Sequence, residues 1–172
     1  MSFNRFKLFK LFNRAAYSAT LATLALGTTL TMDGEQPAFA ASPHEASSRI
    51  AQLKTSTHRW IEVNLNNQQV MAWEGSQMVY NAPVSSGIEA HPTREGSFAI
   101  QSMHITASMR GEDYDLSDVP YTMYYSGHYA LHGTYWHQNF GQPTSHGCIN
   151  LSLEAANWLF SWAHVGTPVV IH

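Results

Sequence analysis

The sequence predicts a mainly β domain, a small β-sandwich or barrel-like fold with one clear helix near its C-terminus. Two observations predict this class. From Trp60 onward, hydrophobic and polar residues alternate with a period of two, and Gly, Asn and Pro separate the alternating segments at short intervals. Hydrophobic residues make up 44% of the 172 residues, which is enough for one core of ordinary size.

The predicted strands follow one another in short segments. In residues 60–65, Ile61, Val63 and Leu65 take one face, as in a half-buried strand. Asn66-Asn67 is a turn pair, so residues 68–73 are expected to return as the second strand. Further strands are predicted over 78–84, 98–105, 120–125, 129–132 and 168–172.

One helix is predicted from Leu153 to about Ala163, because its apolar residues recur near helical spacing. Ser152 is a suitable N-cap, and the segment 166–168 (GTP) ends the helix. The acidic stretch 110–118 (RGEDYDLSD) is expected to be an exposed loop. It is either a solvated connection or a lid over a site, since long loops on β scaffolds often carry binding functions.

The first 40 residues form a separate unit. A basic start and a mild apolar run precede Ala38-Phe39-Ala40, where small residues occupy the positions that an export peptidase reads. This layout is typical of a secretory signal peptide cleaved near Ala40, and a retained anchor is the alternative. Polar residues dilute the run, which lacks the roughly 20 apolar residues of a membrane span. Residues 41–58 predict a polar linker, with one short helix around 49–54 at most, and the domain then covers 59–172.

Composition excludes several classes of function. Charged residues make up 12% of the chain, against about 25% in an average domain, and no basic stripe suits a nucleic acid. Without residues 1–40 the chain keeps five basic and ten acidic residues, so a phosphate or anionic lipid partner is not expected. The single cysteine, Cys148, excludes an intramolecular disulfide framework.

Cys148 is the candidate nucleophile. A thiol reacts as the thiolate and needs a nearby base or aligned backbone donors. His132 lies at a predicted strand end before Gly133, and His146 precedes the cysteine by two residues. Gly147 removes side-chain bulk, so the N–H groups from His146 to Cys148 are expected to form an oxyanion hole. A buried structural cysteine with surface histidines is the alternative.

The segment 132–150 resembles the signature of the L,D-transpeptidase catalytic domain, which has the YkuD-type fold. That signature is a His, a gap, then Ser/Thr-His-Gly-Cys-hydrophobic-Asn or Arg, and His132 with 145–150 (SHGCIN) fills every fixed position. The resemblance extends over roughly 60–172, with further family-like segments at 84–87 (VSSG) and 91–98 (HPTREGSF).

The resemblance implies an exported enzyme of the periplasm or cell wall that acts on peptidoglycan stem peptides. It would cut before a terminal D-residue, hold the peptide as a thioester on Cys148 and pass it to an acceptor amine. His132 maps to the general acid/base, and the Gly133 carbonyl orients its imidazole. The expected oxyanion and substrate residues are Ser145, His146, Gly147 and Asn150, the last in a place where many relatives carry Arg, together with Tyr121, which either walls the site or belongs to the core.

The same resemblance implies that carbapenem-type β-lactams acylate Cys148, and that no cofactor or metal takes part. Two other activities stay open. A hydrolase with the same dyad, an L,D-carboxypeptidase or endopeptidase, differs only in using water as the acceptor. A metal-binding exported protein would use His132, His137, His146 and Cys148 as ligands. Among the histidines, His132 is predicted as the base, because Gly133 can fix its tautomer and His146 is attached to the turn that carries the cysteine.

Overall fold

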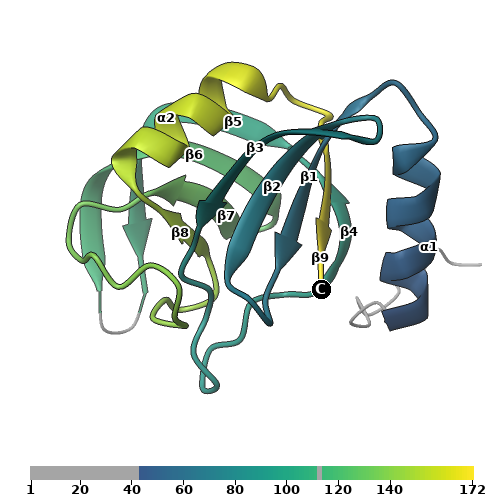
Figure 1. The fold of residues 1–172 in the computed structure, drawn as a ribbon. Helices are drawn as coiled ribbons and strands as arrows, with labels where there is room; N and C mark the ends of the chain where they lie inside the picture. The colour runs from purple at the N-terminus through teal and green to yellow at the C-terminus, as the bar shows by residue number, and fades with distance from the viewer. Residues whose placement is uncertain (1–42, 112–113) are drawn as a thin grey trace, which may run out of the picture. The chain divides into compact units, whose positions relative to one another are not determined.

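The computed structural model describes residues 43–111 and 114–172, and the predicted signal peptide lies outside them. Within this part of the chain, the strands form two sheets, and the mainly β, sandwich-like prediction is confirmed (Figure 1). The five-stranded sheet has the order β3-β2-β1-β9-β4 and the four-stranded sheet the order β5-β6-β7-β8. The strands are β1 (Arg59–Asn64), β2 (Gln69–Glu74), β3 (Gln77–Pro83), β4 (Gly96–Ala99), β5 (Ser102–Arg110), β6 (Asp115–Ser126), β7 (Tyr129–Gly133), β8 (Ile149–Leu151) and β9 (Pro168–Ile171).

The largest difference between the predicted and the observed secondary structure lies in the segment predicted as a linker. Residues Pro43–Lys54 form α1, a helix of 12 residues that packs against the five-stranded sheet. Ala46 and Leu53 are buried in a cluster with Trp60 and Val170. Four- and three-residue spacings place Ala46, Ile50 and Leu53 on one face of the helix, and the many Ser and Thr residues around them hid this weak apolar pattern.

The helix α1 also changes the environment of β1. The alternation predicted a strand with one buried face, but Trp60 is fully buried on the face opposite Ile61. Its indole N–H donates to the Gly75 carbonyl at 2.9 Å, and its ring stacks on Trp73 at 5.4 Å between centroids. A strand covered by the core on one side and by a helix on the other is buried on both faces.

The segment 98–105 was predicted as one strand and is two. The chain leaves β4 at Ala99, passes through the buried Ile100 and enters β5 at Ser102 in the other sheet. The predicted loop 110–118 is instead the end of the β5–β6 hairpin, whose ladder continues to the pair Arg110 and Asp115. Their side chains form a salt bridge with Arg110 Nε 2.9 Å from Asp115 Oδ1.

The second sheet carries the segments of interest. The strand β8 has three residues, too few to show alternation in the sequence, and pairs in parallel with β7 so that His132 lies opposite Asn150. The helix α2 (Leu153–Trp162) follows, and the Ser152 hydroxyl accepts from the Ala155 N–H at 3.1 Å, as predicted for its N-cap. It packs on β6, β7 and β8 through Ala155, Ala156 and Leu159. In the described part of the chain, neither helix is long and apolar enough to cross a membrane.

Candidate active site

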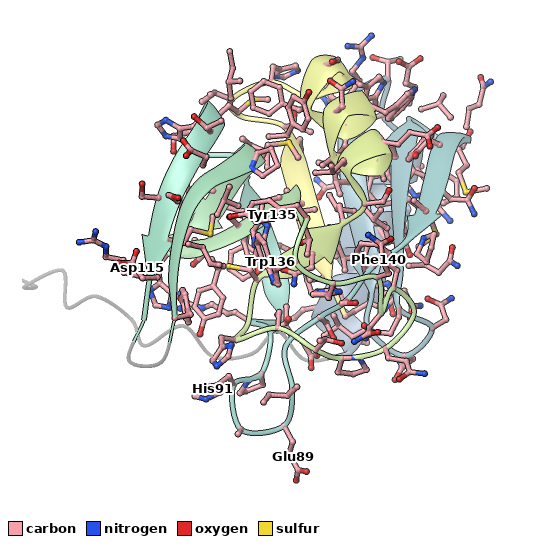
Figure 2. The ribbon with its side chains drawn as sticks, turned by 90° about the vertical axis from the view of Figure 1, so that its left-hand side faces the viewer. Glu89, His91, Asp115, Tyr135, Trp136 and Phe140 are labelled. Atoms are coloured by element: carbon pink, nitrogen blue, oxygen red, sulfur yellow. The ribbon has the colours of Figure 1, made fainter. Side chains whose placement is uncertain are left out.

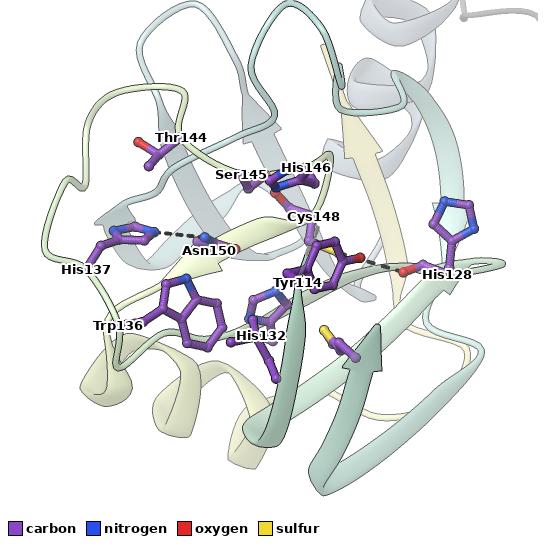
Figure 3. A pocket seen from close by; sticks show the side chains of 12 residues that line it. Tyr114, His128, His132, Trp136, His137, Thr144, Ser145, His146, Cys148 and Asn150 are labelled. Carbon is purple, nitrogen blue, oxygen red and sulfur yellow. Dashed lines mark hydrogen bonds between the residues drawn. The ribbon is translucent and has the colours of Figure 1, made fainter. Parts of the chain in front are cut away.

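The end of β7 and the loop before β8 line a cavity of about 340 Å³ (Figure 3). β7 and β8 are neighbouring parallel strands whose register pairs His132 with Asn150, so residues separated by a long loop lie side by side. The predicted site residues His132, Ser145, His146, Cys148 and Asn150 all line the cavity. Seven further residues line the cavity: Met109, Tyr114, Leu116, His128, Trp136, His137 and Thr144.

His132 is buried at the end of β7. Its Nδ1 lies 3.0 Å from the Gly133 carbonyl, the contact that the sequence predicted. Nδ1 therefore carries the proton, and Nε2 of the neutral ring is the proton acceptor. Burial lowers the pKa of His132 to about 4, the Gly133 carbonyl works against this, and a charge on His137 would lower the pKa further. At neutral pH the imidazole is uncharged.

Cys148 lies half-buried directly before β8. Its thiol is 3.7 Å from the His128 carbonyl, to which it donates. Burial raises the pKa of the Cys148 thiol, and a backbone hydrogen bond from Ala130 lowers it to a smaller extent. Cys148 and His132 therefore present a thiol and a neutral imidazole to the same cavity, and the thiol lacks the low pKa that would give a preformed thiolate.

The loop that carries Cys148 is stabilised by hydrogen bonds between its own residues. The Ser145 hydroxyl donates to the Cys148 carbonyl and accepts from the Gly147 N–H at 3.0 Å. The Gly147 N–H was expected in the oxyanion hole and is instead used inside the loop, which corrects that part of the prediction. Gly147 has φ +113°, and a Cβ there would lie 2.7 Å from the Tyr129 ring, so the position favours glycine.

The segment 84–87 is hydrogen-bonded to the loop that carries Cys148 and to the strand after it. Ser85 bridges to Asn150 through backbone hydrogen bonds of 2.9 Å in both directions, and Gly87 bridges to Ser145. The Thr93 hydroxyl accepts from the Gly87 N–H at 2.8 Å and donates to the Gly147 carbonyl at 2.9 Å. Figure 2 shows the adjoining loop with Glu89 and His91 projecting beyond the sheets. The family-like segments in the sequence therefore serve to support the cysteine loop.

Tyr121, expected either to wall the site or to belong to the core, is not among the described residues that line the cavity. Its φ is +53°, and its ring packs on Phe160 of α2 with 5.8 Å between centroids. The left-handed backbone turns the side chain toward the helix and the core, so the core interpretation of this residue is correct. Tyr135 and Trp136 take different positions. Trp136 lines the cavity, and the distance between the centroids of its ring and the His132 ring is 5.7 Å, whereas about half of the Tyr135 surface is exposed.

The β5–β6 hairpin forms one wall of the cavity through Met109, Tyr114 and Leu116. Met109 and Leu116 are paired across the two strands, and the Tyr114 ring lies 5.2 Å from that of His146. This placement favours the lid interpretation of the acidic stretch over a solvated connection. The signal in the sequence was the pair Tyr114 and Leu116, two residues apart as on one face of a strand, which the surrounding acidic residues hid.

The histidines around the cavity do not converge on a metal site. Over residues 43–111 and 114–172, no three side chains of His, Cys, Asp or Glu are grouped so that they could hold a metal ion. The His146 ring instead packs against that of His91, with 4.7 Å between centroids. The geometry gives the metal-binding alternative no support.

Comparison with known proteins gives one family. Residues 58–171 match the model of the L,D-transpeptidase catalytic domain, YkuD. The Bacillus subtilis (strain 168) protein YciB, a candidate L,D-transpeptidase, is 27% identical over 133 residues, which cover 66% of each chain.

Solved structures agree with this match. An Enterococcus faecium L,D-transpeptidase superposes with a TM-score of 0.64 at 26% identity, over 68% of this chain and 50% of the other. The L,D-transpeptidase LdtMt1 in complex with imipenem superposes with a TM-score of 0.63 at 26% identity, over 66% and 58%. The catalytic domain from the E. faecium enzyme is covered over 98% of its length, at 27% identity and a TM-score of 0.61. The chain thus spans about half to two thirds of the longer relatives and almost all of an isolated catalytic domain.

Proposed function

Because this chain belongs to the L,D-transpeptidase catalytic domain family, we propose that it is a cysteine acyltransferase that acts on peptidoglycan stem peptides. The observation that carries the proposal is the shared cavity of Cys148 and His132, in which Gly133 leaves His132 Nε2 as the proton acceptor. A thiol and a basic nitrogen that open onto one cavity are the minimum that covalent acyl transfer requires.

The two half-reactions follow from this pair. Cys148 Sγ attacks the carbonyl carbon before the terminal D-residue, and His132 Nε2 takes the thiol proton as the C–S bond forms. The C–N bond then breaks, and His132 returns the proton to the leaving amine. An acceptor amine attacks the thioester, His132 takes its proton, and the thiolate leaves and is reprotonated. A neutral His132 suits these reaction steps, because Nε2 must be unprotonated to accept the thiol proton.

The oxyanion of each tetrahedral intermediate needs a backbone donor. Since the Gly147 N–H is bonded to Ser145, the Cys148 N–H is the donor that we assign to this role. The hydrogen bonds from Ser145, Thr93 and Ser85 hold the loop in place without any substrate, so little reorganisation is needed when charge develops.

Product analysis tests the proposed function. The protein is incubated with a disaccharide tetrapeptide from peptidoglycan, and the products are identified by mass, with Cys148→Ala as the control. Loss of the terminal D-residue together with a new dimer supports transpeptidation. Loss of that residue alone would make the protein an L,D-carboxypeptidase, the hydrolytic alternative with the same dyad. An unchanged substrate would contradict both activities.

We also propose that carbapenem-type β-lactams acylate Cys148, since their strained carbonyl presents the same electrophile as the donor amide. With imipenem, the mass of the intact protein should rise by one inhibitor mass, and Cys148→Ala should abolish the rise. A rise that persists in Cys148→Ala would place the nucleophile elsewhere.

Export to the periplasm or cell wall belongs to the same proposal. It is supported by the basic, apolar and A-x-A layout of residues 1–40 and by the extracytoplasmic location of the proposed substrate. Sequencing the N-terminus of the protein recovered from the cell envelope should give a chain that begins at Ala41. A chain that still begins at Met1 would contradict cleavage.

A further inference from the structure

His137 lies at the rim of the cavity, and its protonation state follows from its neighbours. The Asn139 backbone N–H donates to His137 Nδ1 at 3.1 Å. Nδ1 must therefore offer a lone pair. Burial lowers the pKa of His137, so the ring is neutral at neutral pH. A neutral imidazole that accepts at Nδ1 carries its hydrogen on Nε2.

The other side of the ring contacts Asn150. His137 Nε2 lies 2.9 Å from the side-chain nitrogen of Asn150 as drawn in Figure 3, which brings two N–H donors together. Rotation of the amide by 180° about its terminal bond exchanges oxygen and nitrogen and leaves every other atom in place. Only this rotated form gives the His137 Nε2–H an acceptor.

We propose that His137 is a positioning residue that holds the Asn150 amide with its oxygen toward His137 and its NH2 group toward the cavity. Asn150 then presents two N–H donors near Cys148 for an oxygen acceptor of the acyl donor. The proposal deepens the proposed function, since it assigns how that site binds its substrate.

The contact with His137 determines how the side-chain amide of Asn150 is oriented. The backbone of Asn150 is hydrogen-bonded to Ser85 on one side and pairs with His132 on the other. Asn150 is 3% exposed. Among the described residues, the contact with His137 is the hydrogen bond that its side-chain amide makes. In Figure 3, Asn150 lies between His137 and Cys148, and the end of its amide not bonded to His137 is on the side of Cys148.

The charge of the cavity explains what such donors contribute. No Lys or Arg is among the described residues that line it, and His132 is neutral, so a negatively charged or carbonyl oxygen meets no fixed cation there. Amide N–H groups are the donors that remain for such an oxygen. With the amide unrotated, the cavity would offer the oxygen of Asn150 instead and would repel the same group.

A matched pair of variants separates the two contacts of His137. His137→Gln extends its amide nitrogen to about the place of Nε2 and keeps a donor for Asn150. His137→Asn keeps an acceptor for Asn139 but is too short to reach Asn150. Release of the terminal D-residue from the tetrapeptide stem gives KM and kcat, and alkylation of Cys148 by iodoacetamide reports on the dyad alone.

We expect His137→Asn to raise KM about three- to tenfold, the range for one lost hydrogen bond, while His137→Gln stays within twofold of the parent. Asn150→Asp keeps an acceptor for His137 but places an oxygen in the cavity, so it should raise KM at least as much as His137→Asn. Alkylation rates should be unchanged in both His137 variants. A parent-like KM in His137→Asn, an equal loss in His137→Gln, or slower alkylation would overturn the positioning role.

The tautomer of His137 can be tested by a measurement that does not depend on enzyme activity. In protein with ¹⁵N-labelled histidine, the His137 signals, assigned by their loss in His137→Gln, should show the hydrogen on Nε2 at pH 7. A hydrogen on Nδ1 would overturn the proposal whether or not the protein is active. An inactive protein with the hydrogen on Nε2 would instead contradict the proposed function and leave the assigned orientation of Asn150 supported.

Discussion

His132 has lost almost all contact with solvent, while its Nδ1 keeps the Gly133 carbonyl at 3.0 Å. These two effects act in opposite directions on its pKa, and burial is the larger. The same holds for Cys148, where burial outweighs the backbone hydrogen bond from Ala130. At neutral pH both side chains are therefore uncharged, the state from which we propose that they react.

This protonation state has a consequence for stability. The unfolded chain protonates residue 132 near pH 6.5 and the folded protein near pH 4, so between these values the unfolded state binds the extra proton. As pH falls from 7 to 4, the free energy of unfolding should therefore decrease by about 3 kcal/mol through His132 alone. In His132→Gln the decrease measured by urea denaturation should be smaller by about this amount. Cys148→Ala, which removes a group uncharged in this range, should keep the parent's pH dependence, and an equal slope in His132→Gln would contradict the assignment.

The reactivity of Cys148 gives a second prediction at this scale. With the pKa of the thiol raised, its alkylation by iodoacetamide should keep increasing with pH beyond the midpoint of an ordinary cysteine, about 8.5. The measurement is the alkylation rate between pH 5 and 10, with a cysteine-containing peptide as the reference. A plateau of fast alkylation already at pH 6 would instead mean a preformed thiolate–imidazolium pair.

Single residues also show where sequence reasoning succeeds and fails. The resemblance to the family signature assigned His132 and Cys148 to one site, and both line the same cavity. The alternation could not decide whether Tyr121 faces the site or the core, because its left-handed φ of +53° leaves no trace in the pattern. The sequence does not predict the contact of His137 with Asn150, because that contact depends on the pairing of β7 with β8.

At the scale of elements, the cysteine loop depends on a glycine conformation. Gly147→Ala combines a φ of +113° with a Cβ 2.7 Å from the Tyr129 ring, whereas Gly141→Ala combines a φ of +98° with open space. Both variants should lose about 1 kcal/mol or more of stability through backbone strain. Only Gly147→Ala should also displace Cys148 and reduce kcat by at least tenfold. Chemical denaturation and release of the D-residue measure the two effects, and equal kcat in both variants would show that the loop tolerates the shift.

The helix α1 offers a prediction about packing. Leu53 is buried against Trp60 and Val170, so Leu53→Ala should reduce the free energy of unfolding by about 2–4 kcal/mol. Gln52→Ala, one residue away and exposed, should change it by less than about 0.5 kcal/mol. Because α1 contributes no residue to the described cavity, kcat/KM of the folded protein should stay unchanged in both variants. A cost for Leu53→Ala as small as that for Gln52→Ala would mean that the helix is not docked.

For the whole molecule, the alternation of polar and apolar residues predicted the class of fold and most strands, because most strands place apolar residues in a shared core. It could not predict how the strands divide between two sheets. The crossing at Ile100 and the parallel pairing of β7 with β8 depend on contacts between distant segments. That pairing places His132 beside Asn150, so the arrangement of the site could not be derived before the sheet was known.

In the proposed reaction, Cys148 takes up the acyl group of a stem peptide with His132 as its base. The direct measurement is the mass of the intact protein during reaction with a tetrapeptide donor in the absence of an acceptor amine. We expect a mass increase equal to the donor minus its terminal D-residue, located on Cys148. The adduct should form more slowly in His132→Gln and never in Cys148→Ala. Release of the D-residue without a covalent intermediate, or an adduct that forms in Cys148→Ala, would contradict the proposed reaction.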